Sequence, residues 1–152
     1  MKKYASLVVF LVVTVVAASS GSVFQPGPWY AGLAKPEWTP PNWLFPIAWF
    51  ILYFMIAMAG WLAWRTQGFG LALKFWIAQL VFNAAWSYIM FGAHQIGWAL
   101  ADLAAMWLVI AGFIITVWNS SRAAGLLFVP YLAWATFAGA LNLAVWQMNP
   151  GV

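Results

Sequence analysis

Long apolar stretches recur five times along this chain of 152 residues, and its polar residues fall mainly between them. A helix needs about 20 residues to cross the hydrocarbon core of a bilayer, and each stretch is about that long. The stretches are too long and too uniformly apolar for the alternating strands of a membrane barrel. The pattern therefore predicts five transmembrane helices, at about residues 4–24, 44–64, 71–91, 96–118 and 123–146.

Three of the four connections between these stretches are short, at residues 65–70, 92–95 and 119–122. Short links place consecutive helices side by side and antiparallel. We therefore expect an all-α membrane protein with one domain over residues 1–152, built as a compact bundle of five transmembrane helices.

The first apolar stretch permits a second interpretation. Lys2 and Lys3 precede it and a run of small residues, 17–21, ends it, which is the pattern of a secretory signal peptide. Apolar character resumes at Val23 and Phe24, which makes the stretch long enough to cross a bilayer. These residues favour a retained helix but leave the signal peptide as an alternative.

The one long connection, residues 25–43, contains five prolines together with Trp29, Tyr30 and Trp38. Proline fixes φ and biases the preceding residue toward extended backbone, so this loop cannot be helical throughout. A stiff aromatic loop differs from a flexible linker, which is rich in Gly and Ser. Two interpretations remain open: a lid over one end of the bundle, or a belt of rings at the membrane interface.

Composition agrees with the membrane class. Hydrophobic residues make up 66% of the chain, against six Lys and Arg and two Asp and Glu. The basic residues are dispersed and form no basic face, so nucleic acid is not an expected partner. The absence of cysteine excludes disulfides, thiolate catalysis and zinc–sulfur sites.

The charges also predict an orientation. Five crossings would place the two termini on opposite sides of the membrane. The N-terminal side would then hold most of the basic residues, which are Lys2, Lys3, Arg65, Lys74 and Arg122, and the other side would hold Lys35, Glu37 and His94. The positive-inside rule then predicts a cytoplasmic N-terminus in a bacterial cell membrane, which we favour over an outer membrane.

Several polar side chains lie inside the predicted spans. Gln79 and Asn83 are four residues apart and share a helical face, and Asn142 lies in the last span. Such groups need hydrogen-bond partners in a membrane, so one hypothesis is that they hold helices together. The other is that they meet the aromatic pair Trp49 and Tyr53 in an apolar pocket with a few orienting polar groups.

Three further residues are candidates with weaker patterns. Asp102 is the one acidic residue inside a span, yet it lies less than two turns from a helix start, where a negative charge is favoured. His94 lies in a short loop with no second ligand at motif spacing, so no metal site is predicted. Pro130 predicts a kink in the last helix, which would help to open a cavity or to improve packing.

The first half of the chain carries two motifs that resemble those of a known family, the translocator proteins. Residues 35–43 (Lys-Pro-Glu-Trp-Thr-Pro-Pro-Asn-Trp) are similar to its proline- and tryptophan-rich first loop, and Trp49 with Leu52-Tyr53 follows at the family's spacing. Residues 79–86 (Gln-Leu-Val-Phe-Asn-Ala-Ala-Trp) resemble its third helix. Members are also called tryptophan-rich sensory proteins or peripheral-type benzodiazepine receptors.

The second half continues the resemblance in the same order. Residues 91–102 are similar to the family's third loop and fourth helix, and residues 130–142, from Pro-Tyr-Leu-Ala-Trp to Leu-Asn, resemble its fifth helix. Animal members have a tyrosine and an arginine after this Leu-Asn, as a proposed cholesterol motif, and an arginine at the position of His94. This chain has none of these residues, so it resembles a bacterial-type member, and specific sterol binding is less expected.

The resemblance implies a homodimer of five-helix subunits that binds porphyrins such as protoporphyrin IX and haem, isoquinoline- and benzodiazepine-type ligands and, in animals, sterols. It implies that the first helix is retained and that the first loop is a lid over the ligand pocket. Carried over by motif, the pocket residues are Trp38, Trp49, Tyr53, Asn83, Trp134, Ala138 and Asn142. For the dimer face the sequence offers two small-xxx-small pairs, Ala101 with Ala105 and Ala135 with Gly139.

Three functions remain as hypotheses. The first is a tetrapyrrole-binding membrane protein with a sensory or regulatory role, with the porphyrin as ligand and no required cofactor. The second is a light-dependent enzyme that degrades protoporphyrin IX, with Trp49 and Trp134 as catalytic residues. The third is a porphyrin or sterol transporter, although the two halves show no inverted repeat. A hydrolase or kinase is not expected, because the chain has no nucleophile–base pair, metal cluster or phosphate loop.

Overall fold

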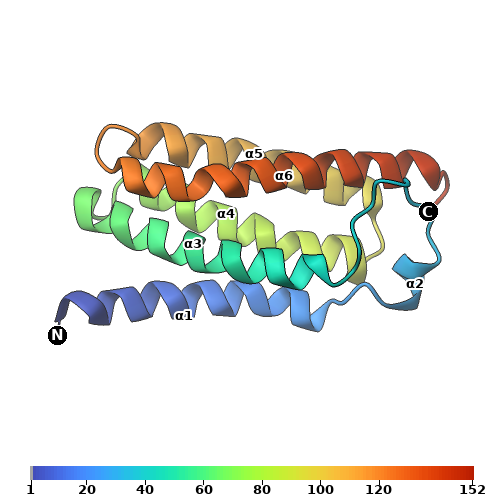
Figure 1. Ribbon diagram of the computed structural model, residues 1–152, viewed down its shortest axis with the longest axis horizontal. Helices are drawn as coiled ribbons and strands as arrows, with labels where there is room; N and C mark the ends of the chain where they lie inside the picture. Colours follow the sequence, from blue (N-terminus) through green and yellow to red (C-terminus); the bar gives the residue numbers. More distant parts are fainter. Residues whose placement is uncertain (1) are drawn as a thin grey trace.

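The computed structural model describes residues 2–152, and in that range the chain is helical with no strand (Figure 1). The order of elements is α1 Lys2–Val23, α2 Gly27–Ala31, α3 Leu44–Gln67, α4 Leu71–Ser87, a π-helix η1 Tyr88–Gly92, α5 Ile96–Val117 and α6 Arg122–Met148. The predicted all-α class is confirmed, and each predicted span coincides with a helix to within a few residues.

Four helices, α1, α3, α5 and α6, are long and apolar enough to cross a membrane. The helix α4 is shorter, with 17 residues, but η1 follows it directly and the chain turns only after Gly92. In η1 the amide of Ala93 donates to the carbonyl of Tyr88 at 2.7 Å, a bond across five residues. The π-helix was not predicted, because its residues continue the same apolar pattern as α4.

The long helices form a ring in which α1 contacts α3 and α4, α6 contacts α3 and α5, and α5 contacts α4 (Figure 1). The N-terminus and the two connections α3–α4 and α5–α6 lie at one end of the bundle. The segment 24–43, the connection from η1 to α5 and the C-terminus lie at the other end, called here the loop end.

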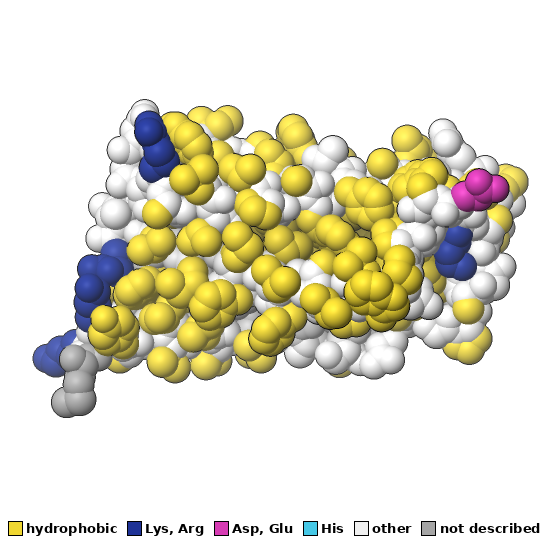
Figure 2. Space-filling view, in the orientation of Figure 1, with side chains coloured by type: hydrophobic (Ala, Val, Ile, Leu, Met, Phe, Trp, Pro, Cys, Tyr) yellow, Lys and Arg dark blue, Asp and Glu magenta, His cyan; other side chains and the backbone are white. Residues whose placement is uncertain are grey.

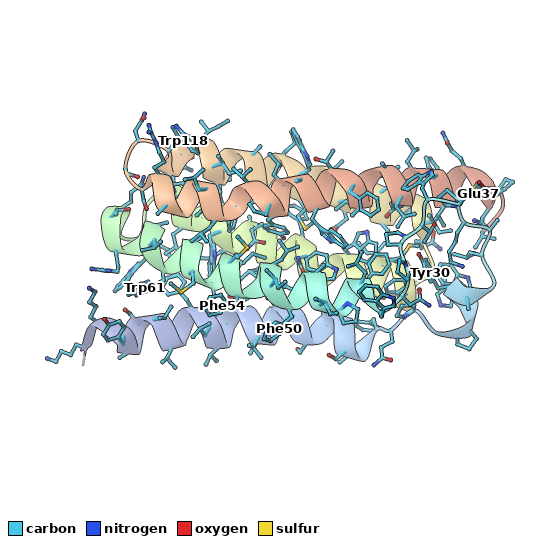
Figure 3. The ribbon with its side chains drawn as sticks, in the orientation of Figure 1. Tyr30, Glu37, Phe50, Phe54, Trp61 and Trp118 are labelled. Carbon is cyan, nitrogen blue, oxygen red and sulfur yellow. The ribbon has the colours of Figure 1, made fainter. Side chains whose placement is uncertain are left out.

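Charge and apolar surface are separated along the bundle axis. In Figure 2 apolar side chains cover the middle of the visible face, Lys and Arg gather at the N-terminal end, and both basic and acidic side chains are visible at the loop end. Large side chains such as Phe50 and Ile115 are more than three-quarters exposed, as expected for surfaces that face hydrocarbon. Figure 3 shows Tyr30 and Glu37 at the loop end and Trp61 and Trp118 at the opposite end.

The core lies where the helices approach most closely. Phe113 of α5 and Phe128 of α6 are fully buried, with ring centroids 4.1 Å apart. Gly60 of α3 allows the ring of Trp76 of α4 to lie against its backbone, and Trp76 Nε1 donates to the carbonyl of Ile56 at 2.8 Å. The missing side chain at Gly60 is therefore what permits α3 and α4 to pack closely.

Two expectations about α6 can be placed in this bundle. The helix continues on both sides of Pro130 from Arg122 to Met148, and the predicted kink stays a prediction. Ala135 is 2% exposed and lies in the core, so the pair Ala135 and Gly139 does not present a dimer face. Ala101, from the other pair, is exposed.

Candidate functional site

A buried hydrogen-bond network joins α3, α4, α5 and α6 around the hydroxyl of Tyr131. This hydroxyl donates to Gln79 Oε1 at 2.8 Å, accepts from Asn83 Nδ2 at 3.0 Å and lies 3.5 Å from Met106 Sδ. The hydroxyl of Tyr53 donates to Asn83 Oδ1 at 2.8 Å. Gln79, Asn83 and Tyr131 are all buried. Gln79 and Asn83 thus share one helical face as predicted, and both form hydrogen bonds with the Tyr131 hydroxyl in an apolar core.

An aromatic cluster lies directly beside this network on the loop side. Trp49 stacks on Tyr53 with ring centroids 5.3 Å apart and meets Trp134 edge to face at 6.3 Å and 86°. Trp49 also meets Tyr131 at 6.3 Å, and Phe45 meets Trp134 at 5.8 Å. The structure therefore brings together four of the residues predicted for the pocket, Trp49, Tyr53, Asn83 and Trp134.

The other two pocket candidates on α6 lie in different surroundings. Ala138 follows Trp134 by one turn, is half-buried, and packs against the same apolar core as Trp134. Asn142 is buried in a second network, where its Oδ1 accepts from Trp86 Nε1 at 3.1 Å and its Nδ2 donates to the carbonyl of Ile96 at 3.0 Å. Asn142 thus ties α6 to α4 and α5 and makes no hydrogen bond to Asn83.

Trp38, the seventh candidate, lies in the long loop and is half exposed. Its ring meets Phe137 of α6 edge to face, with centroids 5.8 Å apart, and Phe137 in turn lies 5.6 Å from Trp134. The loop therefore reaches the aromatic cluster through Phe137, a residue that sequence reasoning placed in a motif but not in the pocket.

The loop is also fastened at two other points. Trp29 stacks flat on His94, with centroids 4.1 Å apart and ring planes within 6°, and Tyr30 meets Phe91 at 5.5 Å. Burial raises the pKa of Tyr30 above its ordinary value of 10.0, so its phenol stays protonated at neutral pH. His94 has a positive φ of 56°, uncommon for a residue with a side chain, and it is exposed.

The side chain of Asn149, just after α6, binds the backbone of the loop at Ala34. Its Oδ1 accepts from the amide of Ala34 at 2.9 Å and its Nδ2 donates to the carbonyl of Ala34 at 2.8 Å. These bonds connect residues 115 positions apart, so the loop is tied to the end of the last helix.

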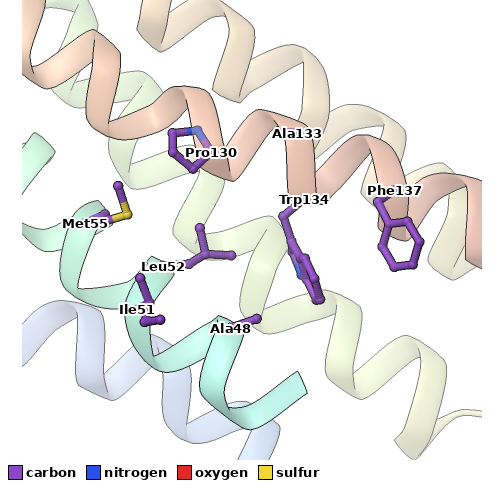
Figure 4. Close-up of a pocket in the computed structure, with 8 residues that line it drawn as sticks. All are labelled: Ala48, Ile51, Leu52, Met55, Pro130, Ala133, Trp134 and Phe137. Atoms are coloured by element: carbon purple, nitrogen blue, oxygen red, sulfur yellow. The ribbon is translucent and has the colours of Figure 1, made fainter. Parts of the chain in front are cut away.

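A groove of about 420 Å³ runs between α3 and α6 (Figure 4). Its lining is almost wholly apolar. The lining residues are Ala48, Ile51, Leu52, Met55, Pro130, Ala133, Trp134 and Phe137. Trp134 is the one residue of the predicted pocket among them, and its ring also meets Trp49 edge to face.

Tyr131 is the residue of the polar network that the sequence did not single out. The motif Pro-Tyr-Leu-Ala-Trp contains it, but a phenol in an apolar stretch gives no sign of its partners. Those partners lie 48 and 52 positions away along the chain, in α4. Only the packing of α6 against α4 and α5 shows that Tyr131 is at the centre of the polar network.

Comparison with known proteins places the chain in a family. The TspO/MBR family profile matches residues 6–147. "Protein CrtK" of Rhodobacter capsulatus is 40% identical over 150 residues, covering 94% of this chain and 92% of that protein. "Tryptophan-rich sensory protein" of Cereibacter sphaeroides is 40% identical, with 96% and 92% covered, and human "Translocator protein" is 39% identical, with 81% and 76% covered. The chain therefore belongs to the TspO/MBR family and is, with its long apolar helices, an integral membrane protein.

Proposed function

We propose that this protein binds a tetrapyrrole, protoporphyrin IX or haem, within the membrane and acts in a sensory or regulatory role, as a homodimer. The observation that carries the proposal is the meeting of Trp49 and Trp134 beside the polar groups of Tyr53 and Asn83. Flat aromatic rings next to a few orienting polar groups are the usual composition of a small-molecule site. A macrocycle packed on these indoles gains about 0.5–1.5 kcal/mol per aromatic contact beyond area burial.

In this proposal α4 and η1 together make a fifth crossing of the membrane, with α1, α3, α5 and α6. Their combined range, residues 71–92, is long enough to span, and the next helix starts only four residues later. The N-terminal end, with its Lys and Arg, would then face the cytoplasm of a bacterial cell.

The loop of residues 25–43 would be the lid of the pocket. Three contacts support this role: Trp38 with Phe137, Trp29 with His94, and the two hydrogen bonds between Asn149 and Ala34. Rotation of the Trp134 ring would open the groove between α3 and α6 toward Trp49 and make room for the macrocycle. Asn83 and Asn142 would then orient the polar edge of the ligand, while isoquinoline- and benzodiazepine-type ligands would share the apolar part of the pocket.

A titration of the purified full chain with protoporphyrin IX, followed by quenching of tryptophan fluorescence, tests this function. We expect saturable binding, and we expect Trp49→Leu and Trp134→Leu each to weaken it about tenfold, since each removes a stacking surface. Trp118→Leu, at the opposite end of the bundle, is the matched control and should leave binding unchanged. Absence of saturable binding by a protein with intact helicity contradicts the proposal.

A second candidate function is light-dependent breakdown of the bound porphyrin. The row of contacts Trp134, Trp49 and Tyr53 favours it, because these rings can each lose an electron. In the first step the photoexcited porphyrin takes one electron from an indole, which leaves an indole radical cation and a porphyrin radical anion. Dioxygen would be the terminal oxidant.

Illumination of the porphyrin-loaded protein in air separates binding from degradation. We expect Trp49→Phe and Trp134→Phe to keep porphyrin binding within a few-fold, because a ring remains, but to slow the loss of porphyrin absorbance at least tenfold, because phenylalanine is harder to oxidise. Equal bleaching of free and bound porphyrin would eliminate the enzymatic function and leave the binding function intact.

A further inference from the structure

A second groove lies between α4–η1 and α5, shares no lining residue with the first, and has a volume of about 440 Å³. Its apolar walls include Phe82 of α4, Ile89 of η1 and Trp98 of α5, and its hollow is left by the small side chains of Ala101 and Ala105. The π-helix forms part of one wall, and single π-helical turns are frequent at functional sites.

The groove contains one carboxyl group. Asp102 lines it, and its Oδ2 is buried with no hydrogen-bond partner among residues 2–152. A buried oxygen without a partner is costly, and native structures satisfy the large majority of such groups. The favourable effect of a helix N-terminus on a negative charge does not explain the position of this carboxylate. Asp102 is the seventh residue of α5, about 9 Å along the axis from Ile96.

We propose that this groove binds a hydrophobic amine, a molecule whose ammonium group is attached directly to an alkyl or ring body. The ammonium would donate a hydrogen bond to Asp102 Oδ2 and neutralise its charge, while the body would lie along Phe82 and Ile89. Trp98, 71% exposed, lies one turn before Asp102 and also lines the groove, so its ring would be available to the same cation. A phospholipid headgroup fits less well as the donor, because its ammonium lies outside the phosphate at the membrane surface, whereas Asp102 lies about 9 Å along α5 from Ile96.

Tryptophan quenching by a brominated amine tests the site in the full chain, reconstituted in phosphatidylcholine nanodiscs. The probes are 12-bromododecylamine and the neutral analogue 12-bromododecanol. We expect a saturable component for the amine with a half-saturation at least tenfold lower than for the alcohol, since charge-assisted hydrogen bonds are the stronger ones. Asp102→Asn should bring the amine to the level of the alcohol, and Ala105→Leu, which fills the hollow, should abolish the saturable component.

Ala104→Leu is the matched control, because Ala104 is exposed on the same helix and does not line the groove. It should leave amine binding unchanged. Equal binding of amine and alcohol by the unmodified protein would overturn the proposal without any variant. Amine binding that is unchanged in Asp102→Asn, or lost equally in Ala104→Leu, would also overturn it. An absence of saturable amine binding would do the same, and it is the result expected if a second copy of the chain covered this face.

The site does not depend on the proposed porphyrin pocket, and the same preparation distinguishes the two. Protoporphyrin IX should not displace the amine, since the two grooves share no lining residue. One-for-one displacement would show a single common site and would contradict a separate amine site. Failure of porphyrin to bind would contradict only the porphyrin pocket and would not affect the amine site.

Discussion

Gly60→Ala is expected to lower the free energy of unfolding by about 3 kcal/mol, the largest effect that we predict for a single methyl group in this protein. A Cβ built at Gly60 would lie closer than 3.0 Å to the ring of Trp76. That ring cannot move aside, because it is 2% exposed and its Nε1 is bonded to the carbonyl of Ile56. Overpacking of this kind costs typically 1–3 kcal/mol, and here a buried hydrogen bond is disturbed as well.

Gly139→Ala is the matched control, since Gly139 also lies inside a helix but a Cβ there would meet nothing within 4 Å. Because alanine favours the helix over glycine, this change should be neutral or stabilise by up to about 1 kcal/mol. Equilibrium unfolding in mixed micelles with increasing dodecyl sulfate would measure both variants. Equal stability of Gly60→Ala and the unmodified protein would show that α3 and α4 do not approach as closely as described.

The helices could be predicted because one physical requirement dominates the sequence. A backbone in hydrocarbon must bond to itself, so every apolar stretch of sufficient length is a helix, and glycine or a polar residue follows α3 and α6. Gly68, with a positive φ of 61°, ends α3 in this way. The π-helical turn at residues 88–92 has no such signature, because it changes the bonding pattern without changing the apolar character.

From spacing alone the candidate site could be predicted only where its residues are neighbours on one helix, whereas the resemblance to the family also grouped Trp49, Asn83 and Trp134 from three helices. Trp49 and Tyr53 are one turn apart and stack on each other. Gln79 and Asn83 are also one turn apart, and both bond to the hydroxyl of Tyr131. Spacing along a helix does not decide which helices face each other. Asn142 therefore could not be assigned to the network with Trp86, and Tyr131 could not be recognised as the partner of Gln79 and Asn83.

Tyr131→Phe gives the second large effect, an expected loss of about 2 kcal/mol in the free energy of unfolding. The change leaves Gln79 Oε1 without its donor and Asn83 Nδ2 without its acceptor, both inside a bundle where water cannot replace them. Hydrogen bonds between membrane helices average only about 0.6 kcal/mol, with a maximum of about 1.7. Two buried groups that lose their partners together should exceed that average.

Two further tyrosines make this prediction specific. Tyr53→Phe removes one hydroxyl that donates to Asn83, so its cost should be about half as large. Tyr88→Phe changes a half-exposed ring at the surface and should alter stability by less than about 0.5 kcal/mol. The order Tyr131, Tyr53, Tyr88 follows from the number of buried partners each hydroxyl serves. If all three variants unfolded alike, the polar groups around Tyr131 would be finding other partners, and the network would not be what holds the four helices in register at the site.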